Sequence, residues 1–325
     1  MMSIKGRKLS MKQKRIAVVI PAYKVRSHLE NVVRKLPEFI DEIIVVDDAC
    51  PEKSYEVLDV IDIKKLVIIN HKINMGVGGA LISGYKKALS LGTDIVVKVD
   101  GDGQMDASYI SLLIEPILDG NADYTKGNRF VDFKALRAMP KVRLLGNSAL
   151  SFMVKASSGY WNLMDPTNGF TAIAKKALQD LDLEVINRRY FFESDMLINL
   201  NIENAVVKDV SIPAKYDNEN SSLSITKTIA EFPPKLFKGF IRRIFFKYFI
   251  YDFNMGSLYM LFGFPMFFGG IGFGFYRWII GATQNVENSV GTVMLAVLPI
   301  ILGVQFLLQA IGIDIDNVPK KCDCK

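Results

Sequence analysis

Short apolar runs alternate with amphipathic stretches along the first 120 residues of the chain. Four runs have the length and β-branched content of strands: Ile16–Ile20, Glu42–Val46, Leu66–Ile69 and Ile95–Val99. The stretches that follow them have helical periodicity: Ser27–Leu36, Ser54–Ile61, Val77–Leu91 and Ala107–Leu118. Four strand–helix units in a row predict an α/β domain with a largely parallel sheet covered on both faces.

The pattern changes near residue 255. From Met255 to Ile313 the chain carries two charged side chains, Arg277 and Glu287. Met255–Tyr276 and Val290–Ile313 are each long enough to cross a hydrocarbon core of about 30 Å, which takes roughly 20 helical residues. We therefore expect a hairpin of two membrane spans, since their length and low charge disfavour two buried core helices.

Basic residues lie on both sides of this hairpin. The cations are Lys235, Lys238, Arg242, Arg243 and Lys247 before it, and Lys320, Lys321 and Lys325 after it. By the positive-inside rule, the preceding domain and both termini are expected in the cytoplasm. Phe232–Tyr251 mixes the first five cations with aromatic residues. It predicts an amphipathic segment at the lipid headgroups, opened by Pro233 and Pro234.

These patterns divide the chain into five parts. We expect a basic N-terminal extension over 1–14, an α/β domain over 15–230, an amphipathic juxtamembrane segment over 231–254, a transmembrane hairpin over 255–313 and a cytoplasmic tail over 314–325. Gly270 and Gly274 have the spacing that lets helices approach closely. Self-association into a homo-oligomer and simple seating of the second span both fit this spacing.

Composition narrows the class of protein. Half of the 325 residues are apolar and the net charge is +6, which excludes a disordered or purely electrostatic binder, so no nucleic-acid partner is expected. Three cysteines and two histidines exclude a disulfide framework and leave little for a zinc site. Cys322 and Cys324 fit either a soft-metal pair or ordinary tail thiols.

Acidic residues follow two of the predicted strands. In parallel sheets, ligands bind beyond the carboxyl ends of the strands. If the fourth strand continues to Asp102, the carboxylates of Asp100 and Asp102 point to the same side. Their hard oxygen atoms suit Mg²⁺ or Mn²⁺, and Gly101 and Gly103 leave room for a diphosphate. A D-x-D sequence is also common in loops.

The second strand ends at Asp47 and Asp48. A carboxylate there can accept hydrogen bonds from a nucleobase or ribose, although a cap or turn ahead of Pro51 fits equally well. The segment Gly76-Val-Gly-Gly-Ala-Leu81 fails the dinucleotide fingerprint, because Leu81 replaces the third glycine and the preceding strand is the third. Its glycines are expected to let a helix start close to a ligand or strand.

With these pieces placed, the chain resembles a family 2 glycosyltransferase with a GT-A fold. The matching segments are Val19-Ile-Pro-Ala-Tyr23, Ile44-Val-Val-Asp-Asp48, Asn74-Met-Gly-Val-Gly-Gly-Ala80, Val99-Asp-Gly-Asp-Gly-Gln104, Gly127-Asn-Arg-Phe130 and the acceptor-side loop Asp165-Pro-Thr-Asn-Gly-Phe170. Within the family, the two C-terminal spans resemble polyprenyl-phosphate glycosyltransferases, including the dolichol-phosphate mannose synthases.

The resemblance implies roles on the donor side. Pro21, Tyr23 and Asp48 would line the nucleoside pocket, with Asp47 supporting them. Asp100 and Asp102 would hold a Mg²⁺ or Mn²⁺ ion and the diphosphate, which makes Asp102 a catalytic residue.

Other roles fall on the acceptor side. Arg129 would contact phosphate, although Asn128 replaces the usual serine. Asp195, in Phe192-Glu-Ser-Asp195, opens an apolar helix where the family keeps its base. For an anionic phosphate acceptor it need only orient the acceptor. Arg188 and Arg189 would pair with that phosphate, or else be solvated or structural.

The implied function is an inverting transfer of a hexose from a UDP- or GDP-sugar to a polyprenyl (undecaprenyl or dolichyl) phosphate at the cytoplasmic membrane face. Its partners would be a nucleotide-diphosphate sugar, the lipid phosphate and the membrane. A lipid-linked oligosaccharide, glycerolipid or polysaccharide acceptor is the alternative. A catalytically silent nucleotide-sugar-binding scaffold is disfavoured by the intact Asp100 and Asp102.

Overall fold

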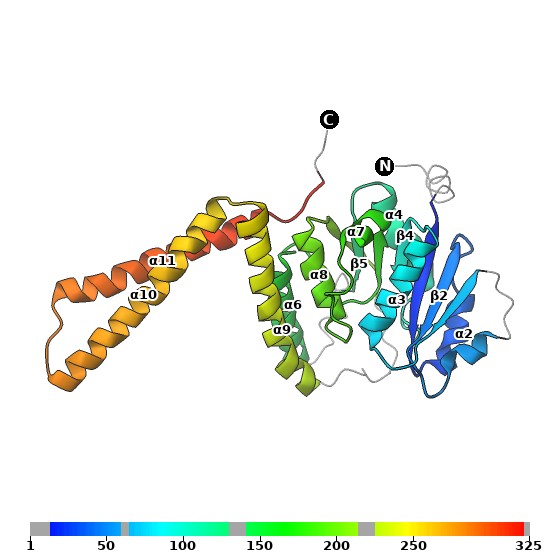
Figure 1. Cartoon of the computed structure of the whole chain (residues 1–325), viewed down its shortest axis with the longest axis horizontal. Helices are drawn as coiled ribbons and strands as arrows, with labels where there is room; N and C mark the ends of the chain where they lie inside the picture. Colours follow the sequence, from blue (N-terminus) through cyan, green and yellow to red (C-terminus); the bar gives the residue numbers. More distant parts are fainter. Residues whose placement is uncertain (1–13, 60–64, 130–140, 214–224, 322–325) are drawn as a thin grey trace. The chain divides into compact units, whose positions relative to one another are not determined.

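A mixed β-sheet organises the N-terminal unit of the chain (Figure 1). The computed structural model describes residues 14–59, 65–129, 141–213 and 225–321. Within them the sheet has seven strands in the order β3-β2-β1-β4-β6-β5-β7, and β6 is antiparallel to both of its neighbours. The strands are β1 (Ile16–Ala22), β2 (Glu42–Asp47), β3 (Leu66–Asn70), β4 (Ile95–Lys98), β5 (Tyr124–Asn128), β6 (Thr171–Ala174) and β7 (Val207–Ser211).

Helices cover both faces of this sheet. In this unit they are α2 (Arg26–Arg34), α3 (Val77–Ser90), α4 (Ile110–Leu118), α6 (Lys141–Ser158), α7 (Lys175–Asp180) and α8 (Phe192–Ile202), with short 3₁₀ helices η1 (Ser54–Leu58) and η2 (Ala107–Tyr109). On one face, Val18 of β1 shares a hydrophobic core with Leu29 of α2 and Leu113 of α4. On the other face, α3 lies so close to β1 that a Cβ on Gly84 would sit 2.3 Å from the Val19 side chain.

The four predicted strand–helix units are confirmed, with one correction. The strands begin at the predicted residues and differ by at most two residues at their ends. The helix expected over Ser54–Ile61 is instead the short η1, because Ser54 is buried and its hydroxyl bonds the Val25 amide and the Cys50 thiol. Residues 60–64 lie outside the described residues.

A long helix, α9, begins before the two prolines. Helix α9 runs over Ile225–Phe245, with Pro233 and Pro234 inside it, so the prediction that these prolines open the segment was wrong. Packing explains why the helix persists through them. Leu236 is buried, and a Cβ on Gly239 would lie 2.4 Å from the Ile198 side chain of α8. A π-helical turn, η3 (Phe246–Tyr251), follows.

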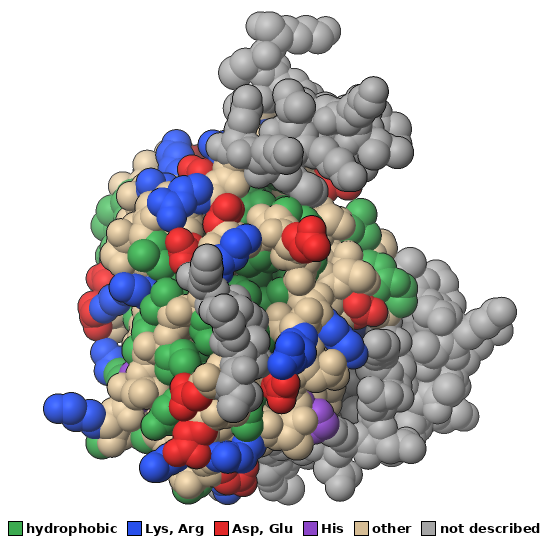
Figure 2. All heavy atoms as spheres, turned by 90° about the vertical axis from the view of Figure 1, so that its right-hand side faces the viewer, with side chains coloured by type: hydrophobic (Ala, Val, Ile, Leu, Met, Phe, Trp, Pro, Cys, Tyr) green, Lys and Arg blue, Asp and Glu red, His purple; other side chains and the backbone are tan. Residues whose placement is uncertain are grey.

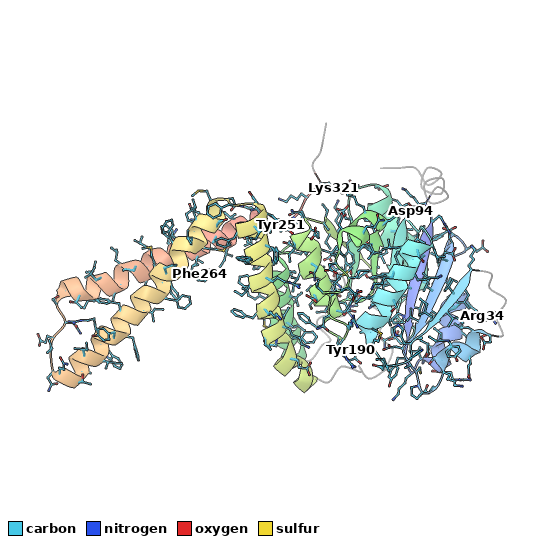
Figure 3. The ribbon with its side chains drawn as sticks, viewed as in Figure 1. Arg34, Asp94, Tyr190, Tyr251, Phe264 and Lys321 are labelled. Atoms are coloured by element: carbon cyan, nitrogen blue, oxygen red, sulfur yellow. The ribbon has the colours of Figure 1, made fainter. Side chains whose placement is uncertain are left out.

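Residues 241–318 form a second compact unit, built mainly from a helical hairpin. Its helices, α10 (Met255–Gln284) and α11 (Val290–Asp316), have the length and composition of membrane spans and are mostly exposed, unlike core helices. Figure 3 shows their side chains projecting outward along both helices, including the labelled Phe264. Both spans start at the predicted residues and extend further at their ends.

Two glycines of the first span allow the second span to pack closely against it. A Cβ on Gly270 would lie 2.9 Å from the Ala296 carbonyl oxygen, and one on Gly274 would lie 3.2 Å from the Ala296 Cβ. Gly303 of α11 packs directly on the Phe267 backbone. The spacing of Gly270 and Gly274 therefore serves contact within the hairpin, whereas Gly269 faces open space.

A buried ion pair closes the other end of this hairpin. The Arg243 guanidinium donates to both carboxylate oxygens of Asp314 at 2.6 and 2.9 Å, and the Tyr248 hydroxyl donates to one of them at 2.8 Å. The Lys247 ammonium donates to the Asn317 carbonyl. Two of the five cations expected at the lipid headgroups are thus buried within the hairpin unit.

The chain returns to the first unit after the hairpin. By packing, the first unit comprises residues 1–240 and 319–325, and Lys321 forms an ion pair of 2.8 Å with Asp123 just before β5. The five expected domain boundaries stay predictions. Among the described residues that Figure 2 draws in colour, positive and negative side chains are interspersed on this face of the molecule.

Candidate active site

The predicted donor-side residues and Arg129, which is predicted to bind the acceptor, lie at one edge of the sheet. The carboxyl ends of β1, β2, β4 and β5 meet there because these strands are parallel, and β6 begins there because it runs in the opposite direction. The residues at or just beyond these strand ends are Pro21, Tyr23, Asp47, Asp48, Asp100, Asp102 and Arg129. Tyr23 is exposed, so its ring is open to stacking by a planar ligand.

Asp48 organises the loop between β3 and α3. Its carboxylate accepts hydrogen bonds from the Met75 and Gly76 amides at 2.8 and 2.7 Å and contacts the His71 ring at 2.8 Å. The Asn74 amide donates to its carbonyl oxygen. Asp48 is buried, so these contacts shape the wall of the site. Its expected contact with a nucleoside stays a prediction.

Asp47 lies beside it with one unused oxygen atom. Its Oδ2 accepts from the Cys50 amide at 3.1 Å, whereas Oδ1 is buried with no hydrogen-bond partner within the described protein. Burial raises the pKa of Asp47 above its ordinary value. A buried acceptor without a partner is costly, and a donor group on a bound ligand would remove that cost.

The D-x-D sequence lies in a turn and not in a strand. Strand β4 ends at Lys98, so the condition that would align the two carboxylates is not met. Gly103 has a positive φ of 80°, and Asp102 Oδ1 accepts the Gln104 amide at 3.0 Å, which together fold the chain back after Asp100. The space beside Gly101 is filled by Val25 and the Pro21 carbonyl, so this glycine serves internal packing.

A buried lysine holds Asp100 in place. Lys98 is 2% exposed, and its Nζ lies 3.1 Å from Asp100 Oδ1 and 2.9 Å from Glu193 Oε1. Burial alone would lower the pKa of Lys98, but the two carboxylates raise it above its ordinary value. Burial raises the pKa of Asp100, although Lys98 opposes this effect. Burial alone would raise the pKa of Glu193, but the charge and hydrogen bond of Lys98, together with the charge of Lys126, lower it below its ordinary value.

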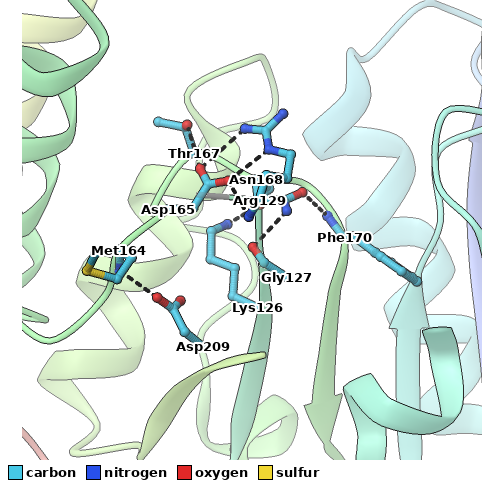
Figure 4. A network of polar contacts seen from close by, with 9 residues as sticks. All are labelled: Lys126, Gly127, Arg129, Met164, Asp165, Thr167, Asn168, Phe170 and Asp209. Atoms are coloured by element: carbon cyan, nitrogen blue, oxygen red, sulfur yellow. Dashed lines mark hydrogen bonds and ion pairs between the residues drawn. The ribbon is translucent and has the colours of Figure 1, made fainter. Parts of the chain in front are cut away.

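The acceptor-side loop is bound to the end of β5 (Figure 4). Arg129 donates to Asp165 through Nε at 2.8 Å and Nη2 at 3.2 Å, and Asp165 is completely buried. This fixes the guanidinium plane, while 41% of the Arg129 side chain stays exposed. An arginine held in this way presents its remaining donors in a defined direction.

Asp195 is placed differently from Glu193. It is buried, and its Oδ2 accepts the Asn187 amide at 2.8 Å, which fixes the segment before α8. That segment carries Arg188, which pairs with the exposed Glu184 at 3.1 Å, and Arg189, whose Nη1 lies 3.5 Å from Asn74 Oδ1. The residue on α8 that contacts the cluster around Asp100 is Glu193; the role expected of Asp195 stays a prediction.

The glycines at the start of α3 allow the segment before α8 to lie close to that helix. A Cβ on Gly76 would lie 2.6 Å from the Arg188 carbonyl oxygen, and one on Gly78 would lie 2.5 Å from that of Asn187. The Gly79 amide donates to the Arg188 carbonyl. The expected close approach is therefore to another loop of the protein and not to a strand.

Sequence reasoning missed the buried lysines. Lys98 and Lys126 interrupt otherwise buried strands, and both are at most 2% exposed. A buried cation requires compensation, so Lys98 inside the apolar run Ile95–Val99 was the available signal. That signal indicates that Lys98 has a partner carboxylate but does not identify it as Glu193.

The donor atoms at this edge fit a divalent cation. The carboxylates of Asp100 and Asp102 lie close enough to repel each other, and Lys98 contacts Asp100 directly. Within the described residues, no three or more His, Cys, Asp or Glu side chains are arranged to hold a metal by themselves. Magnesium and manganese commonly take only one or two carboxylates and complete their shell with water and phosphate oxygens.

Comparison with known proteins defines the class. The model of Glycosyl transferase family 2 matches residues 17–182, half of the chain. A UDP-N-acetylglucosamine–dolichyl-phosphate N-acetylglucosaminyltransferase of Methanococcus voltae is 34% identical over 220 residues, covering 62% of this chain and 87% of the relative. An undecaprenyl-phosphate mannosyltransferase of Micrococcus luteus is 28% identical over 187 residues, covering 56% and 76%.

The fold agrees with this class. A glucosyl-3-phosphoglycerate synthase from Mycobacterium tuberculosis, solved with Mn²⁺, UDP-glucose and phosphoglyceric acid, superposes with a TM-score of 0.55 at 16% identity, covering 75% of this chain and 84% of that chain. The chain therefore belongs to glycosyl transferase family 2. It is a glycosyltransferase with a GT-A fold and two long apolar C-terminal helices.

Proposed function

We propose that this enzyme transfers one hexose from a UDP- or GDP-sugar to a polyprenyl phosphate, with inversion at the anomeric carbon, at the cytoplasmic face of a membrane. The proposal is supported by two features that occur together in this chain. Relatives named for dolichyl and undecaprenyl phosphate match the catalytic unit, and the same chain carries two helices able to span a bilayer. Such a hairpin keeps the enzyme at the surface where a lipid phosphate lies.

The residues at the carboxyl ends of the parallel strands would form the binding site for the nucleotide sugar. Tyr23 offers an exposed ring to the nucleobase, and Asp47 offers its unused oxygen to a ribose or base donor. Asp100 and Asp102 would hold Mg²⁺ or Mn²⁺, which supplies Lewis-acid neutralisation of the leaving diphosphate. Lys98 and Glu193 keep Asp100 in one orientation before any ligand arrives.

On the acceptor side, Arg129, whose guanidinium is oriented by Asp165, would bind the lipid phosphate. An oxygen of this phosphate attacks the anomeric carbon, and the bond from that carbon to the nucleoside diphosphate breaks. The acceptor is already anionic near neutral pH, so no strong base is required. Asp195 would then act by fixing the segment that carries Arg188 and Arg189.

The topology proposed for the membrane is a hairpin with both ends in the cytoplasm. Basic residues before α10 and after α11 favour this orientation. The ion pair between Lys321 and Asp123 supports it, because the chain after the second helix returns to the catalytic unit. Phe237, Ile241 and Phe245 recur every four residues on α9 and are exposed, as expected of a face that meets lipid.

The test uses the purified full chain in lipid nanodiscs with Mg²⁺, a polyprenyl phosphate and a panel of labelled nucleotide sugars. We expect one sugar to appear in a labelled lipid, linked through phosphate and therefore labile to mild acid. Parallel reactions supply a lipid-linked oligosaccharide or a glycerolipid instead. Label that appears only in those products would replace the proposed acceptor, and binding without turnover of any donor would argue for a silent scaffold.

A further inference from the structure

Lys126 is a completely buried cation in the sheet. It lies on β5, and its Nζ donates to the main-chain carbonyl of Asn168 in the acceptor-side loop (Figure 4). Three carboxylates attract its ammonium group: those of Glu193 on α8, Asp165 in the loop and Asp209 on β7. The ammonium of Lys98 on β4 repels it. Burying an ammonium requires such compensation, so this residue is expensive to keep and needs a specific reason.

Its partner, Asn168, is the centre of the loop Asp165–Phe170. The Asn168 side chain is 6% exposed; its amide donates to the Gly127 carbonyl at 2.7 Å and its Oδ1 accepts the Phe170 amide at 3.0 Å. The Gly127 amide donates in turn to the Phe170 carbonyl at 2.8 Å. A Cβ on Gly127 would lie 2.9 Å from the Asn168 amide nitrogen, so the loop is pressed against the end of β5.

This loop connects the two sides of the candidate site. At one end, Asp165 receives the Arg129 guanidinium in a two-pronged contact. At the other end, a Cβ on Gly169 would lie 2.5 Å from Lys98 Nζ and 3.1 Å from Asp100 Oδ2. A shift of the loop would therefore release Arg129 and change the surroundings of Asp100.

From this arrangement we propose that Lys126 is a positioning residue: it holds the loop Asp165–Phe170 against β5 and thereby fixes Arg129 for the acceptor phosphate. The statement about the acceptor rests on the proposed function, whereas the statement about the loop does not. Lys126 touches neither substrate. It acts through Asn168 on Asp165, and through Asp165 on the Arg129 guanidinium.

The test compares Lys126→Met with Lys208→Met in the full chain in nanodiscs. Lys208 lies opposite Thr125 on the neighbouring strand β7 and is exposed, so the same chemical change there leaves the loop untouched. We expect Lys126→Met to raise the KM for polyprenyl phosphate about tenfold or more, the effect of losing a hydrogen bond to a charged group. The affinity for the nucleotide, measured by calorimetry with UDP and GDP, should change less than the KM for the acceptor.

Amide hydrogen exchange provides a second readout that needs no acceptor. In Lys126→Met, the amides of Asn168, Gly169 and Phe170 should exchange faster, while β1 and β2 keep the protection of the wild type. Lys208→Met should resemble the wild type throughout. If Lys126→Met does not fold, Lys126→Gln is substituted, because its shorter side chain cannot reach the same carbonyl and the same two readouts apply.

Unchanged exchange in the loop, or exchange that rises equally over the whole domain, would overturn the positioning role. Faster exchange in the loop with an unchanged acceptor KM would overturn its link to Arg129. If the wild type transfers no sugar to any polyprenyl phosphate, the proposed acceptor is wrong. The exchange experiment then still decides whether Lys126 positions the loop.

Discussion

Charged side chains placed inside the sheet determine the geometry of the candidate site. Lys98 and Lys126 lie on neighbouring parts of the sheet and have opposite pKa shifts, because Lys98 contacts two carboxylates directly whereas Lys126 donates to a carbonyl. The first shift is upward and the second is downward. The contacts of each lysine therefore decide whether burial or attraction dominates.

Asp102→Asn tests the donor-side assignment. It removes an anionic ligand with almost no change in volume, and a metal contributes several kcal/mol of transition-state stabilisation. We expect turnover to fall about 100-fold or more, at 1.36 kcal/mol per tenfold, with an unchanged circular dichroism spectrum. Asp119→Asn, at the exposed end of α4, is the control. Wild-type turnover in Asp102→Asn would remove Asp102 from the site.

Lys126 also predicts a pH dependence of stability. Burial lowers its pKa from 10.5 to about 8, so between pH 8 and 10.5 the unfolded chain binds more protons than the folded chain at this residue. Its contribution to the free energy of unfolding therefore rises with pH across that window, by roughly 3 kcal/mol at most. The melting temperature of the wild type minus that of Lys126→Met should increase from pH 7 to 10. A flat difference would contradict the lowered pKa.

At the scale of single residues, the sequence identified acidic residues at the candidate site but not the residues that they contact. Asp47, Asp48, Asp100 and Asp102 follow strands whose ends are visible in the apolar pattern, so their common edge could be predicted. The contact of Lys98 with Glu193 joins residues 95 positions apart, and nothing in local periodicity carries such a pairing. The resemblance to the family directs attention to Asp195, whereas Glu193, two residues earlier, is the residue that contacts Lys98.

Among the elements, those with strong apolar periodicity were predictable. Strands β1, β2 and β4 are buried along nearly their whole length, and β3 is half-buried, so all four have continuous apolar sequences. Strand β5 reads Tyr124-Thr-Lys-Gly-Asn128, which has the composition of a turn, yet all five residues are buried in the sheet. Its strand conformation comes from pairing with β6 and β7 and not from its own residues.

The α10–α11 hairpin provides a matched pair of glycine substitutions. A Cβ on Gly303 would lie 2.6 Å from the Phe267 backbone nitrogen, whereas one on Gly269 meets no atom within 4 Å. We expect Gly303→Ala to destabilise the full chain in detergent by about 1 to 3 kcal/mol through overpacking. Gly269→Ala should be neutral or slightly stabilising, because alanine favours helix.

Thermal unfolding of both variants, followed by circular dichroism in the same detergent, is the measurement. Equal melting temperatures for Gly303→Ala and Gly269→Ala would mean that the two helices are not packed as described. Loss of stability only in Gly269→Ala would instead favour self-association through the outer face of the hairpin.

At the scale of the whole molecule, the hairpin unit is inserted between two segments of the catalytic unit. The chain leaves that unit after Phe240 and rejoins it at Pro319. The two helices expose much apolar surface and have the length and composition of membrane spans, which favours a bilayer as their environment. Length and low charge made the two apolar helices predictable, whereas the continuation of α9 through two prolines required its packing on α8.

Ending the chain at Phe240 separates catalysis from anchoring. This boundary keeps Leu236 and Gly239 against the catalytic unit, whereas a cut at residue 230 would remove them. The truncated protein should bind UDP or GDP as the full chain does, since the donor-side residues all precede α9. It should transfer sugar to a short, water-soluble polyprenyl phosphate at a rate near that of the full chain.

Transfer to a long-chain polyprenyl phosphate in vesicles should fall much further, because anchoring confines enzyme and acceptor to one surface and raises their effective concentration, a gain that reaches 10² to 10⁴-fold in linked binding systems. The quantity to compare is the ratio of kcat/KM for the vesicle acceptor to that for the soluble one, in the truncated and full chains. The soluble acceptor is the internal control, because a folding defect would lower both rates together. An equal ratio in the two proteins would mean that the hairpin does not bring the site to its acceptor.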